Sequence, residues 1–290
     1  MALPQHWING SPSERPSPYD RAFRYGDGVF ETLRIHRGRA HLWQYHCNRL
    51  LCGADRLNIA VTQRQLDAAL TTALNYLQSH DVVDAAGRLQ LSRGQGEQGY
   101  RPSDTEPTLS FGVAAITPWR EVPKSVATYL CATRLAEQPA LAGLKHCNRL
   151  EQVLAANELK AMRFEGEGLQ CSVMEDLVCG VSSNIFLVFG NTLLTPAVER
   201  CGIAGTVRRA VLEVLSPARD LEVRVGTVTL DDLLRADELI LTNALRGIRS
   251  VSHCLMPGRA RSGFTSTTFT STTWGDRLRE DFFDWCDSGE

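Results

Sequence analysis

One lysine stands out as a candidate nucleophile. Lys145 is one of three lysines among the 31 lysine and arginine residues, the others being Lys124 and Lys160. A lysine amine can lose its proton and attack a carbonyl group, whereas arginine keeps its charge. Lys145 follows the uncharged run Pro-Ala-Leu-Ala-Gly-Leu at 139–144, a setting that would desolvate the amine and lower its pKa. An ordinary solvated lysine before a helix is the alternative, and the position by itself leaves both open.

A glycine-rich segment is a candidate phosphate site. Gly202 and Gly205 precede a predicted helix that begins with Thr206-Val207. The N–H groups and the dipole at a helix start favour a bound dianion, and glycine lets the backbone approach it. No Gly-Lys-Ser/Thr follows, so this is not a nucleotide P-loop, and a plain loop-to-helix junction is the alternative. Thr242-Asn243 and Arg49 are further candidate phosphate ligands.

Other site types lack their residues in the sequence. The segment 94–99 matches G-x-G-x-x-G, but a dinucleotide site needs a helix next, and two prolines within 100–107 forbid one. We therefore predict a loop there. The seven histidines show no H-x-x-x-H spacing, so no metal is expected, and no G-x-S-x-G motif occurs. A reactive lysine with a non-nucleotide phosphate cradle fits pyridoxal phosphate, whose aldehyde needs an amine and whose phosphate needs an anchor.

Composition limits the class of protein. The 290 residues have a formal net charge of −2, with 43% hydrophobic and 22% charged residues, which is typical of a globular protein and lacks a nucleic-acid binder's basic surplus. Nine cysteines without a C-x-x-C pair indicate reduced thiols. The N-terminus lacks a signal-peptide pattern, and no apolar run approaches the roughly 20 residues of a membrane span. We expect a cytoplasmic protein that acts on a small molecule, without nucleic-acid or membrane partners.

Predicted elements must position these residues. An alternating strand fits 29–34, a helix from Leu42 carries Arg49, and a helix with Asn148 as candidate N-cap fits 148–163 just after Lys145. Other helices fit 62–79, 206–215, 230–235 and 276–285, and strands fit 7–10, 88–93, 108–116, 126–135, 169–174, 185–189, 192–195, 221–228 and 238–242. Thr265 to Thr273 is predicted to be a loop.

Prolines bound one plausible linker, 117–123. We therefore predict a mixed α/β (α+β) chain with an N-terminal α/β domain at 1–117, a linker at 118–123 and a C-terminal α/β domain at 124–290. The second domain would carry Lys145.

Six motifs follow one another along the chain. They are Asp20-Arg-Ala-Phe-Arg-Tyr-Gly-Asp-Gly-Val-Phe-Glu-Thr32, Ser92-Arg-Gly-x-Gly-x-x-Gly-Tyr100, Leu144-Lys-His-x-Asn-Arg-Leu-Glu-Gln-Val-Leu154, Ser183-Asn-Ile-Phe186, Gly202-Ile-x-Gly-x-x-Arg208 and Leu241-Thr-Asn-Ala-Leu-Arg-Gly-Ile248. In this order the chain resembles, over nearly its whole length, the fold-type IV pyridoxal-phosphate enzymes. That family includes branched-chain and D-amino-acid aminotransferases and 4-amino-4-deoxychorismate lyase. The lysine motif and the 92–100 loop resemble the lyase branch, although Glu97-Gln98 differs from its usual form.

The resemblance implies a two-domain D-amino-acid-aminotransferase-like fold, pyridoxal 5'-phosphate as cofactor and a homodimer. Lys145 resembles the catalytic lysine that holds the cofactor as a Schiff base and then serves as general base. Cofactor contacts are expected at Arg49, Cys179, Ser183, Asn184, Thr206, Val207, Thr242 and Asn243. Substrate contacts are expected at Tyr25, Arg93, Tyr100 and Arg134.

One position departs from the family pattern. Aminotransferases of the family carry a glutamate five residues before the Asn of S-N-x-F, where it pairs with the pyridine nitrogen; Cys179 stands there in this chain. A neutral thiol cannot hold a pyridinium as a carboxylate does, so the ring becomes a weaker electron sink. Transamination depends on that electron sink more strongly than an elimination does when the elimination forms an aromatic ring. We therefore expect a lyase that converts 4-amino-4-deoxychorismate to 4-aminobenzoate and pyruvate in folate synthesis. An aminotransferase of the same fold and a cofactor-free binding protein are the alternatives.

Overall fold

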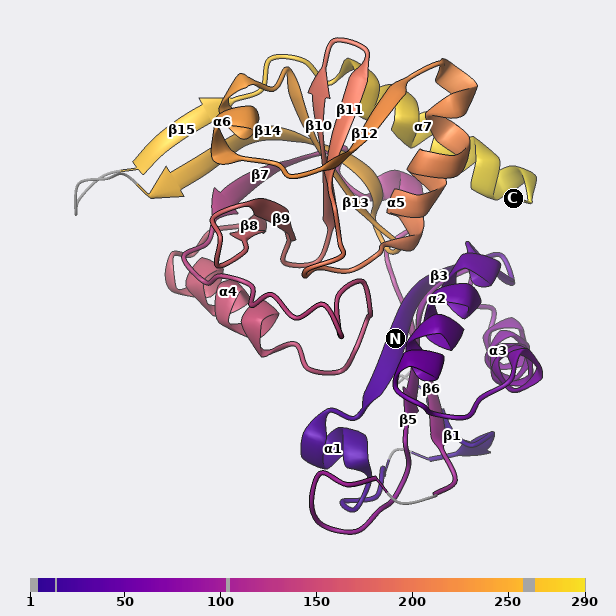
Figure 1. The fold of residues 1–290 in the computed structure, drawn as a ribbon. Helices are drawn as coiled ribbons and strands as arrows, with labels where there is room; N and C mark the ends of the chain where they lie inside the picture. The colour runs from indigo at the N-terminus through magenta and orange to yellow at the C-terminus, as the bar shows by residue number, and fades with distance from the viewer. Residues whose placement is uncertain (1–4, 14, 103–104, 258–263, 290) are drawn as a thin grey trace. The chain divides into compact units, whose positions relative to one another are not determined.

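The computed structural model describes residues 5–13, 15–102, 105–257 and 264–289 (Figure 1). Its contacts divide the chain into unit 1, Met1–Glu121 with Leu144–Asn148, and unit 2, Val122–Gly143 with Arg149–Glu290. The segment Leu144–Asn148, which the sequence analysis assigned to the second domain, packs within unit 1 because its backbone pairs with a strand there. The predicted domain limits themselves stay a prediction.

Unit 1 is built on a six-stranded antiparallel sheet with the order β2-β1-β6-β5-β3-β4. Its strands are β1 (Gln5–Ile8), β2 (Ser11–Pro12), β3 (Gly28–His36), β4 (Arg39–Ala40), β5 (Asp84–Ser92) and β6 (Thr108–Ala115). The helices α2 (Trp43–Arg56) and α3 (Gln63–Ser79) pack on it, and Thr62 starts α3 with a capping box. Leu50 and Leu66 of these helices share a core with Leu33 of β3. Burial of each such leucine stabilises the fold by about 2 kcal/mol. A short helix α1 (Arg21–Tyr25) and the 3₁₀ turn η1 (Trp119–Glu121) complete the unit.

Unit 2 contains a nine-stranded mixed sheet with the order β12-β11-β10-β13-β14-β7-β8-β9, and β15 pairs with β14. The strands are β7 (Ser125–Leu130), β8 (Glu167–Cys171), β9 (Leu177–Gly180), β10 (Asn184–Phe189), β11 (Thr192–Pro196), β12 (Glu222–Gly226), β13 (Glu238–Asn243), β14 (Gly247–Pro257) and β15 (Phe264–Thr268). The helices are α4 (Leu150–Ala161), α5 (Thr206–Ala210), which continues as the π-helical turn η2 (Val211–Leu215), the 3₁₀ turn η3 (Pro217–Arg219), α6 (Leu230–Arg235) and α7 (Thr273–Ser288). The predicted mixed α/β class is confirmed.

Local predictions fail at two places. Thr265 to Thr273 was predicted to be a loop, but β15 runs from Phe264 to Thr268 and pairs with β14. Threonine is β-branched and suits a strand once a neighbour offers hydrogen bonds, and that neighbour, β14, was itself not predicted. Asn148 is not the cap of α4 because Arg149 occupies that position, and the Asn148 side chain donates to the carbonyl of Gly26 at 3.1 Å.

The 94–99 glycines do not form a nucleotide-binding turn. No helix follows them within 95–102 and 105–115, which confirms the predicted loop. Across the described ranges, no helix is both long and apolar enough to cross a lipid bilayer.

Candidate active site

Backbone pairing positions Lys145 beside β3. The amide of Phe30 donates to the Lys145 carbonyl at 2.9 Å, and the amide of Cys147 donates to the carbonyl of Gly28 at 2.9 Å. The strand β4 pairs with Ile35 and His36 at the other end of β3. Residues 145–147 therefore pair with the part of the β3 edge that β4 does not cover. The Lys145 amine lies 4.3 Å from the centroid of the buried Phe30 ring, whose face attracts an ammonium group. The lysine is therefore held by main-chain bonds and by an aromatic face.

A buried carboxylate organises the neighbouring helix face. Glu31 of β3 accepts from Nε of Arg49 at 2.8 Å, from a second nitrogen of the same guanidinium, and from Nδ1 of His46 at 2.6 Å. His46 and Arg49 are three residues apart on α2, which puts both on one side of the helix. Burial would raise the pKa of Glu31, but the charge of Arg49 and the bond from His46 lower it to about 2. The carboxylate therefore fixes the planar head of Arg49, the predicted phosphate ligand.

The buried environment of His46 favours its neutral form. Burial lowers its pKa against the attraction of Glu31. An ionised carboxylate only accepts hydrogen bonds, so Nδ1 of His46 carries the proton and Nε2 is an acceptor. That buried Nε2 has no hydrogen-bond partner within the described residues. Sequence analysis missed Glu31 and His46; the signal was a glutamate on the apolar face of an alternating strand.

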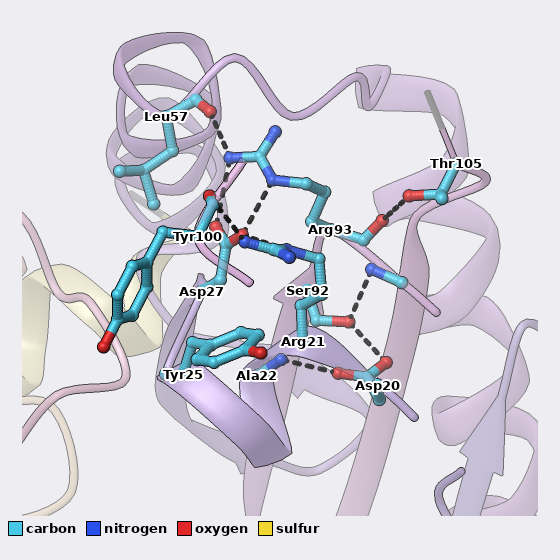
Figure 2. Close-up of polar contacts among 12 residues, drawn as sticks. Asp20, Arg21, Ala22, Tyr25, Asp27, Leu57, Ser92, Arg93, Tyr100 and Thr105 are labelled. Atoms are coloured by element: carbon cyan, nitrogen blue, oxygen red, sulfur yellow. Dashed lines mark hydrogen bonds and ion pairs between the residues drawn. The ribbon is translucent and has the colours of Figure 1, made fainter. Parts of the chain in front are cut away.

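Arg93, a predicted substrate ligand, donates to oxygens of the protein (Figure 2). Its Nε and Nη2 donate to the Asp27 carboxylate at 2.8 and 3.0 Å. Nη2 also donates to the carbonyl of Leu57 at 2.7 Å, and Nη1 donates to that of Asn58 at 2.9 Å. Every nitrogen of the guanidinium is thus used, and these bonds tie the start of the 94–102 loop to the end of α2.

A second arginine completes this loop anchor. Arg21 donates to Asp27 at 2.8 Å and to the carbonyls of Gly99 and Tyr100 at 2.9 and 3.1 Å (Figure 2). Burial raises the pKa of Asp27, but the bonds from Arg93 and Arg21 outweigh that effect and lower it. The Tyr25 hydroxyl accepts from the amide of Gly99 at 2.9 Å, and the rings of Tyr25 and Tyr100 are 5.7 Å apart. The two predicted tyrosines therefore lie together, with Tyr100 88% exposed.

Arg134, the other predicted substrate ligand, belongs to unit 2 and is also paired. Its Nε and Nη2 donate to Glu175 at 3.0 and 2.8 Å, and Nη1 donates to the carbonyl of Cys131 at 2.8 Å. Glu175 is 61% exposed at its side chain. The bidentate pair holds Arg134 at the surface of unit 2.

The residues of the predicted phosphate cradle lie in unit 2. Asn184 and Thr242 are direct partners across β10 and β13, and the Asn184 amide donates to the carbonyl of Ile203 at 2.8 Å. A Cβ at Gly205 would collide with the Asn184 side chain, so glycine is required where α5 begins. The hydroxyl of Thr242 is buried and has no hydrogen-bond partner within the described residues. A donor of this kind near a glycine turn and a helix start fits a phosphate group.

The other predicted cofactor contacts in unit 2 differ from one another in environment. Thr206 and Val207 are buried at the first turn of α5. The Ser183 hydroxyl is buried and, like that of Thr242, has no partner within the described residues. The side chain of Asn243 accepts from the amides of Leu245 and Arg246 at 3.1 and 2.8 Å, so it shapes the turn into β14.

Cys179 is a buried neutral thiol. It lies on β9 in an apolar cluster with Leu135, Val178 and Cys201. Burial, followed by the influence of Cys201, raises the pKa of Cys179 to about 12. In the described ranges no carboxylate hydrogen-bonds to it, since Glu175 pairs with Arg134 and Glu167 accepts from the amide of Ser182 at 2.7 Å. Those ranges also hold no cluster of three or more His, Cys, Asp or Glu that could bind a metal ion.

Known proteins similar to this chain include lyases and aminotransferases. The family model for amino-transferase class IV matches residues 28–254. An aminodeoxychorismate lyase of Vibrio harveyi is 35% identical over 258 residues, which cover 87% of this chain and 92% of that protein. A putative branched-chain-amino-acid aminotransferase of Methanocaldococcus jannaschii is 29% identical over 78% of each chain. The crystal structure of 4-amino-4-deoxychorismate lyase from Pseudomonas aeruginosa has a TM-score of 0.83 at 34% identity, covering 96% of this chain and 98% of that one.

Proposed function

Because this chain belongs to the amino-transferase class IV family, we propose that it is a pyridoxal-phosphate-dependent lyase that converts 4-amino-4-deoxychorismate to 4-aminobenzoate and pyruvate in folate synthesis. The observation that carries the proposal is the placement of Lys145, whose amine lies on the Phe30 ring while its backbone is bonded to β3. The 35% identity with a lyase over most of the chain supports this reaction class.

Residues of unit 2 fit the phosphate of the cofactor, because Thr242 and the first turn of α5, at Thr206 and Val207, would donate to it. In unit 1, Arg49 is a further candidate phosphate ligand, and Glu31 keeps its guanidinium in place. Ser183, Asn184 and Asn243 would line this site. When bound, pyridoxal phosphate supplies an electron-withdrawing ring that stabilises negative charge on the substrate carbon beside nitrogen.

Lys145 would perform the proton transfer. Its amine would hold the cofactor aldehyde until the substrate amine takes that place. The released Nζ would then take the proton from the ring carbon that bears nitrogen. The electron pair left behind would form a ring double bond as the neighbouring carbon–oxygen bond breaks and the three-carbon group leaves as enolpyruvate. Enolpyruvate becomes pyruvate when its terminal carbon takes up a proton. Tyr25 and Tyr100 would contact the substrate from the anchored 94–102 loop.

Cys179 would favour this elimination over transamination. We place it at the pyridine nitrogen, where a thiol that stays neutral cannot hold a proton on the ring. A weaker electron sink slows reactions that must store and reprotonate a carbanion. The elimination depends less on that electron sink, because the formation of an aromatic ring drives it.

We also propose a cytoplasmic homodimer. Leu150, Val153 and Leu154 of α4 are exposed at the i, i+3, i+4 spacing of one helix face, which suits a second subunit better than water. All nine cysteines are free, as expected in a reducing compartment. Sedimentation should give a dimer, and Leu154→Lys should shift it toward the monomer.

Release of pyruvate tests the function directly. Purified protein should form pyruvate and 4-aminobenzoate from 4-amino-4-deoxychorismate without any keto-acid acceptor. Lys145→Ala should abolish this activity and the visible absorbance that borohydride removes, whereas Lys124→Ala, an exposed lysine, should keep both. Transamination of a D- or branched-chain amino acid without pyruvate release would favour the aminotransferase, which the Methanocaldococcus relative represents. Absence of the absorbance would favour a cofactor-free binding protein.

A further inference from the structure

One arginine near Lys145 lacks the carboxylate partner that its neighbours have. Arg21, Arg93 and Arg49 each donate to an aspartate or glutamate of unit 1. Arg88 of β5 forms no ion pair within the described residues, and its one side-chain hydrogen bond, to Oε1 of Gln90, is long at 3.5 Å. The positive charge of Arg88 is therefore not balanced by a carboxylate of the described residues.

Arg88 and Lys145 share one aromatic ring. Arg88 is paired with Thr32 across β5 and β3, and Phe30 lies two residues before Thr32 on the same face of β3. The Arg88 guanidinium carbon is 4.0 Å from the Phe30 centroid, and the Lys145 amine is 4.3 Å from the same centroid. Both distances are measured to the centroid of the Phe30 ring. The separation between the Arg88 guanidinium carbon and the Lys145 amine nitrogen is therefore at most the sum of the two distances. Three adjacent chain segments thus bring two cations to one ring.

The charge of Arg88 creates a place for an anion beside Lys145. Partial desolvation of the guanidinium on the ring lowers the pKa of Arg88, although the residue as a whole reaches solvent. The planar fork of Arg88 matches a carboxylate, and its contact with the Phe30 ring holds it near Lys145. An anionic substrate group bound here would balance the charge of Arg88.

We propose that Arg88 binds the carboxylate of the substrate's enolpyruvyl group, the part that leaves as pyruvate; this rests on the proposed lyase function. In 4-amino-4-deoxychorismate the enolpyruvyl ether is attached to the ring carbon next to the amine-bearing carbon. The other carboxylate is on the opposite side of the ring. A guanidinium that shares Phe30 with Lys145 is at the amine end of the substrate, so it reaches the neighbouring group. Arg88 takes no proton: it orients the carbon–oxygen bond that breaks while the proton passes to Nζ of Lys145.

Product inhibition of the holoenzyme tests this assignment. Pyruvate carries the carboxylate in question, and 4-aminobenzoate carries the other one. In Arg88→Gln, inhibition by pyruvate should weaken about 10- to 100-fold, as expected for a lost charge-assisted pair, and KM for the substrate should rise similarly. Inhibition by 4-aminobenzoate should stay within about twofold of wild type, since a group that Arg88 does not contact keeps its binding energy. Arg88→Lys should recover part of the pyruvate inhibition.

A matched control is Arg39→Gln, which removes an exposed arginine from β4 of the same sheet. It should leave both inhibition constants unchanged, and circular dichroism should show that all variants are folded. The assignment is overturned if Arg88→Gln weakens inhibition by 4-aminobenzoate but not inhibition by pyruvate. It is also overturned if the variant weakens inhibition by neither product. Failure of the wild-type enzyme to release pyruvate would instead overturn the lyase function, and it would be seen before any variant is made.

Discussion

Glu31 and His46 share a 2.6 Å hydrogen bond inside unit 1, where each residue is 1% exposed. A buried carboxylate is costly unless it is paired, and Arg49 supplies the positive charge. The pair therefore couples the position of a predicted phosphate ligand to the strand that also holds Lys145.

This coupling predicts an acid-dependent loss of stability. The pKa of Glu31 is about 2 in the folded protein and 4.5 ordinarily. Since the folded value is the lower one, the stabilisation is present above pH 4.5 and is lost as the pH falls toward 2, amounting to about 3 kcal/mol. Urea unfolding across that range should show a steeper loss for wild type than for Glu31→Gln. The exposed Glu121→Gln should keep the wild-type slope, and equal slopes in all three proteins would contradict the role of Glu31.

The Arg93–Asp27 pair predicts a structural role for an arginine first expected at the substrate. Arg93→Gln should lower the free energy of unfolding by about 1 to 3 kcal/mol and expose the 94–102 loop to protease. Asp27→Asn should have a similar effect, and the double variant should cost less than the two single changes added together. Additive losses would show that the pair is not coupled. If Arg93→Gln stays stable but has a raised KM, the result would instead indicate that Arg93 binds the substrate.

Thr242 predicts opposite effects on stability and on cofactor binding. Its buried hydroxyl has no hydrogen-bond partner among the described residues, so Thr242→Val should leave the apoprotein as stable or more stable. The same change should weaken pyridoxal phosphate binding about tenfold if the hydroxyl donates to the phosphate.

Thr195→Val is the matched control for Thr242. The Thr195 hydroxyl is also buried but donates to the carbonyl of Ile185 at 2.8 Å, so its removal should destabilise the apoprotein by about 1 kcal/mol. Thermal melts of apoprotein and equilibrium titration with cofactor measure the two effects separately. Unchanged cofactor affinity in Thr242→Val would remove this residue from the phosphate site.

The neutral thiol of Cys179 leads to a prediction about which reaction the enzyme catalyses. Cys179→Glu should raise transamination relative to pyruvate release, because a carboxylate at the pyridine nitrogen restores the electron sink. Cys179→Ala should keep the wild-type ratio, since both side chains are neutral. The nitrogen chemical shift of labelled cofactor gives a readout apart from activity and should move only in the glutamate variant. An unchanged shift would place Cys179 away from the ring nitrogen.

Features that depend on residues close in sequence could be predicted without coordinates. The helix predicted at 62–79 matches α3, and the alternation at 29–34 predicted the core of β3. The motif around Lys145 identified the family and the candidate nucleophile, because a motif preserves local chemistry.

Only the tertiary structure decided which charges are used. Arg93 and Arg88 lie five residues apart and look equivalent in sequence. Asp27 and two helix-end carbonyls accept from Arg93, whereas Arg88 has no carboxylate partner in the part of the chain that the structure describes. Lys145 belongs with β3 because of two main-chain bonds to residues more than a hundred positions away. Periodicity and spacing report on neighbours along the chain, whereas ion pairing and desolvation depend on residues that only folding brings together.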